Sequence, residues 1–237
     1  MKKTVFIARP FVQYGEPTMR RQPPLPGLLS PQAVLRRVSQ RLAAHFTGVF
    51  AAETVQRYVD DAYRSLAATA SIHAHLPLIT ERFAAQQLTS VARAEGLLPK
   101  EHPTVLFVCD HNAARSQIAA ALLARRLPDR VTVHSAGSHP HGQIDPTVLA
   151  AMREIGVDLS EDFPKPLTGA ILRSADIVVT MGCGDACPVL PGKRYFDWNL
   201  SDPLGRPLDE VRAIRNTIDV RVRRLADDLA RPRAQEN

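Results

Sequence analysis

The sequence predicts an α/β fold, a small parallel four-stranded sheet flanked by helices, preceded by an all-α three-helix bundle. Two observations carry this prediction. Apolar residues recur at helical spacing within residues 29–98. From residue 103 to residue 237, short apolar runs alternate with amphipathic stretches, which is the pattern of parallel strands joined by crossover helices.

The N-terminal half begins with residues 1–28, which are rich in proline and arginine, and we expect them to form a flexible arm. Ser30-Pro31 predicts the first helix, with an N-cap followed by proline at the first helical position. A second helix is expected from about Ala51 and a third over Leu78–Ala94. A bundle over residues 29–98 buries little core by itself, so we expect these helices to form a homodimer interface.

The second half is expected to supply the sheet. Its first strand is a continuous apolar run, typical of a strand that is buried on both faces. The expected strands are Thr104–Val108, Val131–His134, Asp176–Thr180 and Arg194–Trp198. The expected helices between and after them are Ser116–Leu127, Pro146–Ile155 and Leu208–Leu229.

Composition excludes several classes of protein. Apolar runs such as Val105–Val108 are far too short to span a bilayer, and we expect a cytoplasmic protein without membrane contact. Residues 1–100 carry 13 Lys and Arg against 6 Asp and Glu, whereas residues 101–237 carry 17 against 18. The basic residues are scattered and not interleaved with aromatic ones, so we expect no nucleic-acid partner. Three cysteines, an odd number, do not suggest a secreted disulfide framework.

The segment from Cys109 to Ser116 lies between a strand and a helix, where α/β proteins bind ligands. Backbone amides and the helix N-terminus favour an oxyanion there, and Arg115 adds a forked donor for two of its oxygens. The same field stabilises a thiolate, so Cys109 is the predicted nucleophile, and Ser116 can donate its hydroxyl to that sulfur. Asn112 tolerates the left-handed backbone that a tight loop needs. The predicted substrate-binding residues are His111, Asn112, Ala113, Ala114, Arg115 and Ser116.

A general acid is also required, because an oxygen must leave the anion in protonated form. Asp202 stands in a loop with Pro203 and Gly205, where the backbone can aim a carboxyl group over a site. Such a segment alone is usually a turn. In combination with the cysteine loop, Asp202 becomes the predicted acid.

Cys183 and Cys187 follow the third expected strand, so they should lie at the same edge of the sheet. On a helix their Cβ atoms would be about 5–6 Å apart. A disulfide needs about 3.5–4.5 Å, so a loop is required, which the glycines beside Cys183 permit. Two inert thiols, or a metal site with His139 or His141, are the alternatives. The spacing is not that of a zinc site, and we expect no metal.

Over about residues 104–230 the chain resembles the arsenate reductases that have the low-molecular-weight tyrosine phosphatase fold. The matching motifs are residues 111–117, Ser135–Ser138, Pro164–Pro166, Met181–Pro188, Pro191–Arg194 and Asp197-Trp198. The helical half resembles the three-helix dimerisation domain that is fused to some of these reductases. Two residues depart from the pattern. Ala114 stands where glycine is usual, and Asp110 would oppose both thiolate and anion if its carboxylate pointed inward.

The resemblance implies that the chain reduces arsenate to arsenite, for arsenic detoxification. It implies that Cys109 attacks arsenate, that Cys183 attacks the resulting adduct, and that Cys187 captures Cys183 as a disulfide. An external thiol reductant, thioredoxin or mycothiol, would restore the thiols without any bound cofactor. Phosphate or sulfate would fit the same oxyanion site.

Three other functions compete with thioredoxin-coupled reduction. In a low-molecular-weight protein tyrosine phosphatase, Cys183 and Cys187 would be spectators. Such phosphatases carry aromatic residues after the Asp-Pro pair, whereas Leu204 and Gly205 favour a small inorganic anion. A single-cysteine arsenate–mycothiol transferase would need Cys109 alone. A DNA-binding helical module joined to an anion sensor ranks last, because no helix offers an obvious recognition face.

Overall fold

The computed structural model describes residues 30–68, 76–182 and 187–231. Its elements are α1 (Pro31–His45), α2 (Ala52–Ala67), α3 (Leu76–Ala94), β1 (Thr104–Cys109), α4 (Arg115–Arg126), β2 (Thr132–Gly137), α5 (Pro146–Arg153), α6 (Gly169–Ser174), β3 (Ile177–Met181), β4 (Arg194–Asp197) and α7 (Leu208–Ala230). The predicted fold class is therefore confirmed. Helix α6 was not predicted, because six residues are too few for a helical period to appear. The expected arm, residues 1–28, lies outside the described residues. Within residues 30–68, 76–182 and 187–231, no helix has the length and apolar content needed to cross a membrane.

All four strands are parallel, in the order β2-β1-β3-β4. The central strands β1 and β3 are neighbours. After β1 the chain continues to β2 at one edge of the sheet, and after β3 it continues to β4 at the other edge. Their carboxyl ends therefore form a topological switch point, where open α/β sheets bind ligands. The register sets Cys109 between Gly137 of β2 and Met181 of β3, so the loops that follow these three strands meet at one place.

Strand β1 is buried along its whole length, and its side chains alternate between two apolar cores. Val105, Phe107 and Cys109 belong to a core shared with helices α4, α5 and α7. Leu106 and Val108 belong to a second core shared with α1, α2, α3 and α6. This arrangement explains the continuous apolar run, because a strand covered on both faces has no polar side.

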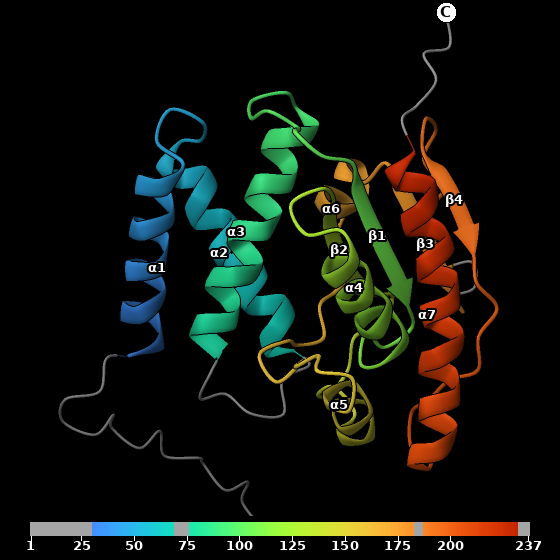
Figure 1. Ribbon diagram of the computed structural model, residues 1–237. Helices are drawn as coiled ribbons and strands as arrows, with labels where there is room; N and C mark the ends of the chain where they lie inside the picture. The colour runs from blue at the N-terminus through green and yellow to red at the C-terminus, as the bar shows by residue number, and fades with distance from the viewer. Residues whose placement is uncertain (1–29, 69–75, 183–186, 232–237) are drawn as a thin grey trace, which may run out of the picture.

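The N-terminal helices complete one side of the sheet. Figure 1 shows α1, α2 and α3 on one side of the strands and α7 on the other. Phe83 and Leu88 of α3 are fully buried in the same core as Leu106 and Val178 of the sheet. Gln86 of α3 also forms a hydrogen bond with His134 of β2, with 2.5 Å between Nε2 of the glutamine and Nδ1 of the histidine. The apolar faces that we expected to meet in a homodimer are thus partly turned toward the chain's own sheet, and the homodimer stays a prediction.

Candidate active site

The thiol of Cys109 lies at the end of β1, directly before the loop that leads into α4. Its Sγ atom is 2.9 Å from the hydroxyl oxygen of Ser116. Asn112 Nδ2 donates to the same hydroxyl oxygen at 2.7 Å. Because that oxygen accepts from Asn112, the hydroxyl hydrogen is available to the sulfur, and a thiolate at Cys109 would gain a donor.

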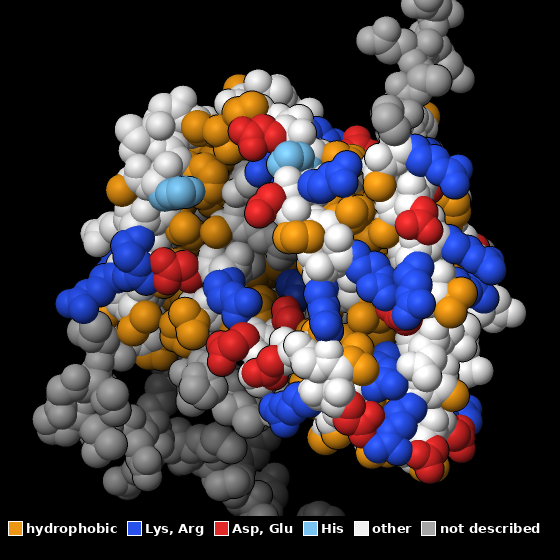
Figure 2. Space-filling model, viewed as in Figure 1, with side chains coloured by type: hydrophobic (Ala, Val, Ile, Leu, Met, Phe, Trp, Pro, Cys, Tyr) orange, Lys and Arg blue, Asp and Glu red, His pale blue; other side chains and the backbone are white. Residues whose placement is uncertain are grey.

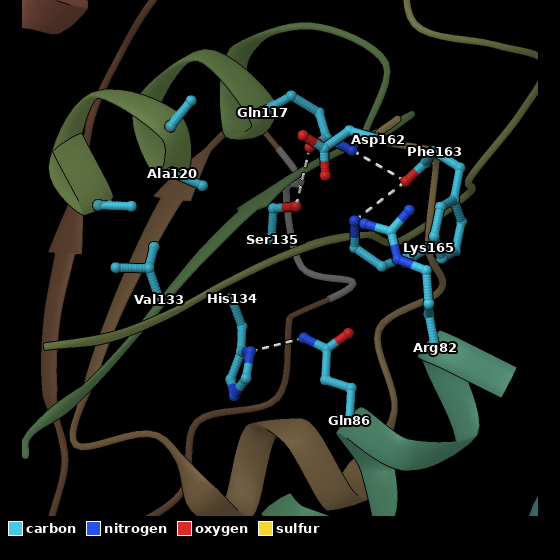
Figure 3. A pocket seen from close by; sticks show the side chains of 12 residues that line it. Arg82, Gln86, Gln117, Ala120, Val133, His134, Ser135, Asp162, Phe163 and Lys165 are labelled. Carbon is cyan, nitrogen blue, oxygen red and sulfur yellow. Dashed lines mark hydrogen bonds between the residues drawn. The ribbon is translucent and has the colours of Figure 1, made fainter. Parts of the chain in front are cut away.

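Asn112 holds the loop from behind. Its φ of 50° is the left-handed conformation expected from the sequence, and its side chain is fully buried. Asn112 Oδ1 accepts the amide of Lys165 at 2.8 Å and Nε2 of Gln117 at 3.1 Å. Gln117 in turn donates to the carbonyl of Phe163 and accepts from the hydroxyl of Ser135 (Figure 3). The side chain of Asn112 is therefore fully used in support of the loop. The sequence analysis places Gln117 and Lys165 within matching motifs but assigns them no role.

Figure 3 shows Gln117, Ser135, Phe163 and Lys165 beside a cavity of about 260 Å³ that lies between α3, α4 and β2. Cys109 does not line this cavity. Lys165 is buried in its wall, where burial lowers the pKa of its ammonium group to about 8. His134 lies nearby, and burial together with the charges of Lys165 and Arg93 lowers its pKa to about 4.

Gly137, at the end of β2, allows the loop to come close. A Cβ atom at this position would lie 2.6 Å from the backbone oxygen of Asp110 and 3.0 Å from the amide nitrogen of Asn112. Two further hydrogen bonds join the backbones, from Ser138 to Cys109 and from His139 to Asp110. The Ser-Ala-Gly-Ser motif thus has a steric reason in this fold.

The carboxylate of Asp110 lies among Ser138, His139 and His111, with its Oδ2 atom 3.4 Å from His111 Nε2. It accepts hydrogen bonds from Ser138 Oγ at 3.0 Å and His139 Nδ1 at 2.7 Å. The hydrogen bond from His139 holds the pKa of this carboxyl group below its ordinary value. Asp110 itself is not among the residues that line the pocket beside Cys109.

The pocket beside the thiol brings several predicted residues together. It is lined by Cys109, His111, Ala113, Ala114, Arg115, Asp202 and Leu204. Arg115 donates from one terminal nitrogen to Asp202 Oδ2 at 2.7 Å, and its Nε is buried without a hydrogen-bond partner. The Arg115 side chain is 8% exposed, whereas that of Asp202 is 40% exposed. The acid, the guanidinium and the thiol therefore share one site, with Asn112 and Ser116 behind it.

Unused donors surround this site. The amide groups of residues 111–116 find no acceptor within the described part of the chain. Buried donors are rarely left unpaired in proteins, and the N-terminus of α4 adds positive potential at the same point. Together with the unpaired Nε of Arg115, these amides form the kind of concavity that binds a tetrahedral anion.

Gly182 makes room for the guanidinium. It directly follows β3 and has a φ of 76°. A Cβ atom there would come within 2.8 Å of a terminal nitrogen of Arg115. In the sequence this glycine was considered only for the loop around Cys183, so its contact with the arginine was missed.

The sequence predicts that two further thiols, Cys183 and Cys187, act together with Cys109. Cys183 lies outside the described residues. Cys187 is partly buried and packs against the second core, together with Leu190 and Tyr195. Within the described ranges, no group of three His, Cys, Asp or Glu side chains could hold a metal ion.

Residues 104–235 match the family model of the low molecular weight phosphotyrosine protein phosphatases. The chain belongs to this family. Residues 35–92 match a second model, the N-terminal domain of protein-tyrosine-phosphatase-like proteins.

Within the low molecular weight phosphatase family, the solved and curated relatives described below are arsenate reductases. A thioredoxin-dependent arsenate reductase from Corynebacterium glutamicum is 47% identical, with a TM-score of 0.76, and the match covers 83% of this chain and 96% of that one. An arsenate reductase from Staphylococcus aureus is 34% identical over 123 residues, which are 50% of this chain and 92% of the relative. Arsenate reductase 2 from Staphylococcus haemolyticus is 36% identical over 119 residues, 48% of this chain and 89% of the relative. The chain is thus a member of the arsenate reductase branch of the family, as the sequence motifs indicated.

Proposed function

We propose that this reductase converts arsenate to arsenite with Cys109 as nucleophile, Arg115 and the loop amides as anion ligands, and Asp202 as general acid. The observation that carries the proposal is the set of unpaired donors beside a buried thiol. A thiol alone would be an inert core residue, and unpaired donors alone would be an anion site. Together they are suited to attack on a bound oxyanion.

Arsenate binding would rearrange one ion pair. In the unliganded chain Arg115 is paired with Asp202 at 2.7 Å, so the anion must replace that carboxylate on the guanidinium. The planar fork of Arg115 can then hold two arsenate oxygens. Asp202, released from the guanidinium, remains beside the anion, where it can accept a proton from one hydroxyl group of the bound arsenate. The Cys109 sulfur forms a bond to arsenic, an arsenic–oxygen bond breaks, and Asp202 protonates the oxygen that leaves as water.

Reduction would follow through the other two thiols. Cys183 attacks the sulfur of Cys109, the electron pair of the sulfur–arsenic bond passes to arsenic, and arsenite leaves. Cys187 then attacks Cys183, which frees Cys109 and leaves a Cys183–Cys187 disulfide. Two thiols are oxidised as arsenic(V) becomes arsenic(III), so the electrons balance without a bound cofactor. A dithiol such as thioredoxin would reduce the disulfide, in keeping with the thioredoxin-dependent relative.

The walls of the pocket favour a small inorganic anion over a phosphotyrosine. Ala113 and Ala114 are small, Leu204 is aliphatic, and none of the described lining residues offers a flat ring surface for a tyrosyl group except the imidazole of His111. Phosphate and sulfate should therefore compete with arsenate. Phosphotyrosine hydrolysis is the second candidate, because it is the activity for which the matching family model is named.

The charge distribution offers little for a nucleic acid. Figure 2 shows Lys and Arg side chains interspersed with Asp and Glu on the face in view. Several arginines of α7 are paired, Arg212 with Glu154 and Arg223 with Asp219. We propose arsenate and thioredoxin as the partners of this chain.

The test is arsenate-dependent NADPH oxidation in the presence of thioredoxin and thioredoxin reductase. The wild-type chain should be active, and Cys109→Ser should be inactive, because a serine hydroxyl is not ionised in the loop. Cys187→Ser should accumulate a Cys109–Cys183 disulfide, and Cys183→Ser should stop at the arsenic adduct. Peptide mapping after alkylation identifies each species.

A different pattern would assign a different chemistry. Full activity of Cys183→Ser and Cys187→Ser with mycothiol as donor would make the chain a single-cysteine transferase. Substantial turnover by Cys109→Ser would remove the nucleophile assignment. Hydrolysis of aryl phosphates with no arsenate-dependent oxidation would favour the phosphatase.

A further inference from the structure

Asp145 connects three parts of the catalytic half. It precedes α5, where its Oδ1 accepts the amides of Thr147 at 2.8 Å and Val148 at 3.3 Å. Its Oδ2 accepts the amide of Gly205 at 3.2 Å. Its own backbone amide donates to the carbonyl of Ala113 at 3.1 Å. Asp145 thus contacts three segments. They are residues 109–116, which we call the anion loop, the N-terminus of α5, and residues 202–206, which we call the acid loop.

The acid loop has few other attachments. Pro203 is buried and packs the turn against the domain, while Leu204 is 46% exposed. Arg206 Nε bonds the carbonyl of Asp202 at 2.9 Å within the loop, and Arg206 Nη1 pairs with the exposed Glu210 of α7 at 2.7 Å. The ion pair of Asp202 with Arg115 ends once an anion takes the guanidinium. Among the described residues, the hydrogen bond from the Gly205 amide to Asp145 Oδ2 then still joins the backbone of the acid loop to the segment before α5.

We propose that Asp145 is a positioning residue that fixes the acid loop relative to the anion loop, and so aims Asp202 at the leaving oxygen. The inference rests on the proposed role of Asp202. A helix N-cap needs one acceptor, which serine or asparagine supplies about as well as aspartate. A carboxylate has a second oxygen, and here that oxygen holds Gly205. The contact with the acid loop therefore explains why this residue is an aspartate, whereas the N-cap of α5 alone would not require one.

Two substitutions separate these roles. Asp145→Ser and Asp145→Asn both keep an N-cap oxygen for α5, and both lose the second acceptor for Gly205. We expect each to lower kcat for arsenate by about tenfold, since small displacements of a reacting group are costly. The affinity for inorganic phosphate should change less than about twofold, because the Ala113 contact is made by the backbone. A purely capping role predicts wild-type kcat for both.

The matched control is Asp158→Ser. Asp158 accepts the amide of Ser160 at 2.9 Å, in the same local geometry, without contacting either loop. Asp158→Ser should keep wild-type kcat, and chemical unfolding should give similar stabilities for the three serine and asparagine variants. A loss of kcat in Asp158→Ser equal to that in Asp145→Ser would overturn the inference.

The decisive measurement compares kcat of the double variant Asp145→Ser/Asp202→Asn with kcat of Asp202→Asn alone. If Asp145 acts through Asp202, the second substitution should cause no further loss of kcat, because residues that act as a unit are not additive. An equal tenfold loss in both backgrounds would overturn the inference and leave the acid assignment intact. Wild-type kcat for Asp202→Asn alone would instead overturn the acid assignment, and this inference with it.

Discussion

The anion loop and the acid loop carry the two halves of the proposed chemistry, and the fold holds them in opposite ways. Asn112, in the anion loop, is fully buried and bonded through its side chain to Ser116, Gln117 and the backbone of Lys165. Asp202, in the acid loop, is 40% exposed and paired with the arginine that the substrate needs. The donors must be preorganised before the anion arrives, whereas the acid must change partners during each turnover.

Asp202→Asn offers the largest test of this difference. We expect kcat to fall by about 10²–10⁴-fold, the usual contribution of a positioned acid. Phosphate affinity should stay equal or improve, because asparagine competes less well than a carboxylate for Arg115. Asp209→Asn, which alters an exposed carboxylate paired with Arg212, is the control. A pH–rate profile and kcat identical to wild type would mean that another group protonates the leaving oxygen.

Gly182→Ala should disturb the preorganised anion-binding part of the site, because it displaces Arg115. The new Cβ would lie 2.8 Å from the guanidinium, which must move, and we expect kcat/KM to fall by about 10–10²-fold with weaker phosphate binding. Gly192→Ala is a matched control, because its φ of 77° imposes the same backbone strain with no atom within 4 Å. Equal losses in both variants would show that strain, and not contact with the arginine, matters.

His134→Gln should have the smallest effect on activity and a measurable one on stability. The folded pKa of His134, about 4, lies below its unfolded value of 6.5, because burial disfavours the charged ring. As pH falls from 6.5 to 4 the unfolded chain binds a proton that the folded chain does not, so stability declines over this window. Removing the imidazole should recover about 3 kcal/mol at pH 4. Chemical unfolding at pH 7 and pH 4 measures this, with His102→Gln as the control; an unchanged pH dependence would contradict it.

The parts of the site that could be predicted from the sequence are those whose residues lie close together in one continuous segment. Cys109, Arg115 and the left-handed Asn112 follow from one loop between a strand and a helix, and Asp202 from a turn motif. Gln117, Lys165, Gly182 and Asp145 were missed as supporting residues, because each acts on a segment far away in the sequence. No local pattern indicates which carbonyl or carboxylate a side chain will meet.

The same limit applies to the fold. The spacing of apolar residues predicted three N-terminal helices, and Ser30 caps α1 as expected, at 3.2 Å from the amide of Ala33. The apolar face of an amphipathic helix indicates that the face is buried, but it does not indicate which element or chain buries it. The sequence favoured a partner chain, whereas Phe83 and Leu88 are buried in a core that includes the chain's own sheet.

This shared core has a consequence for how the chain is made. Helices α1–α3 are synthesised before any strand, and the sheet is complete only after β3 and β4 have been added. At about 5–20 residues per second, the interval between the end of α3 and the start of β3 lasts roughly 4–16 s on the ribosome. During that time the part of this core that Val178 of β3 completes is uncovered. A nascent chain arrested before Ile177 should therefore bind hydrophobic dyes, and release through β4 should abolish that binding.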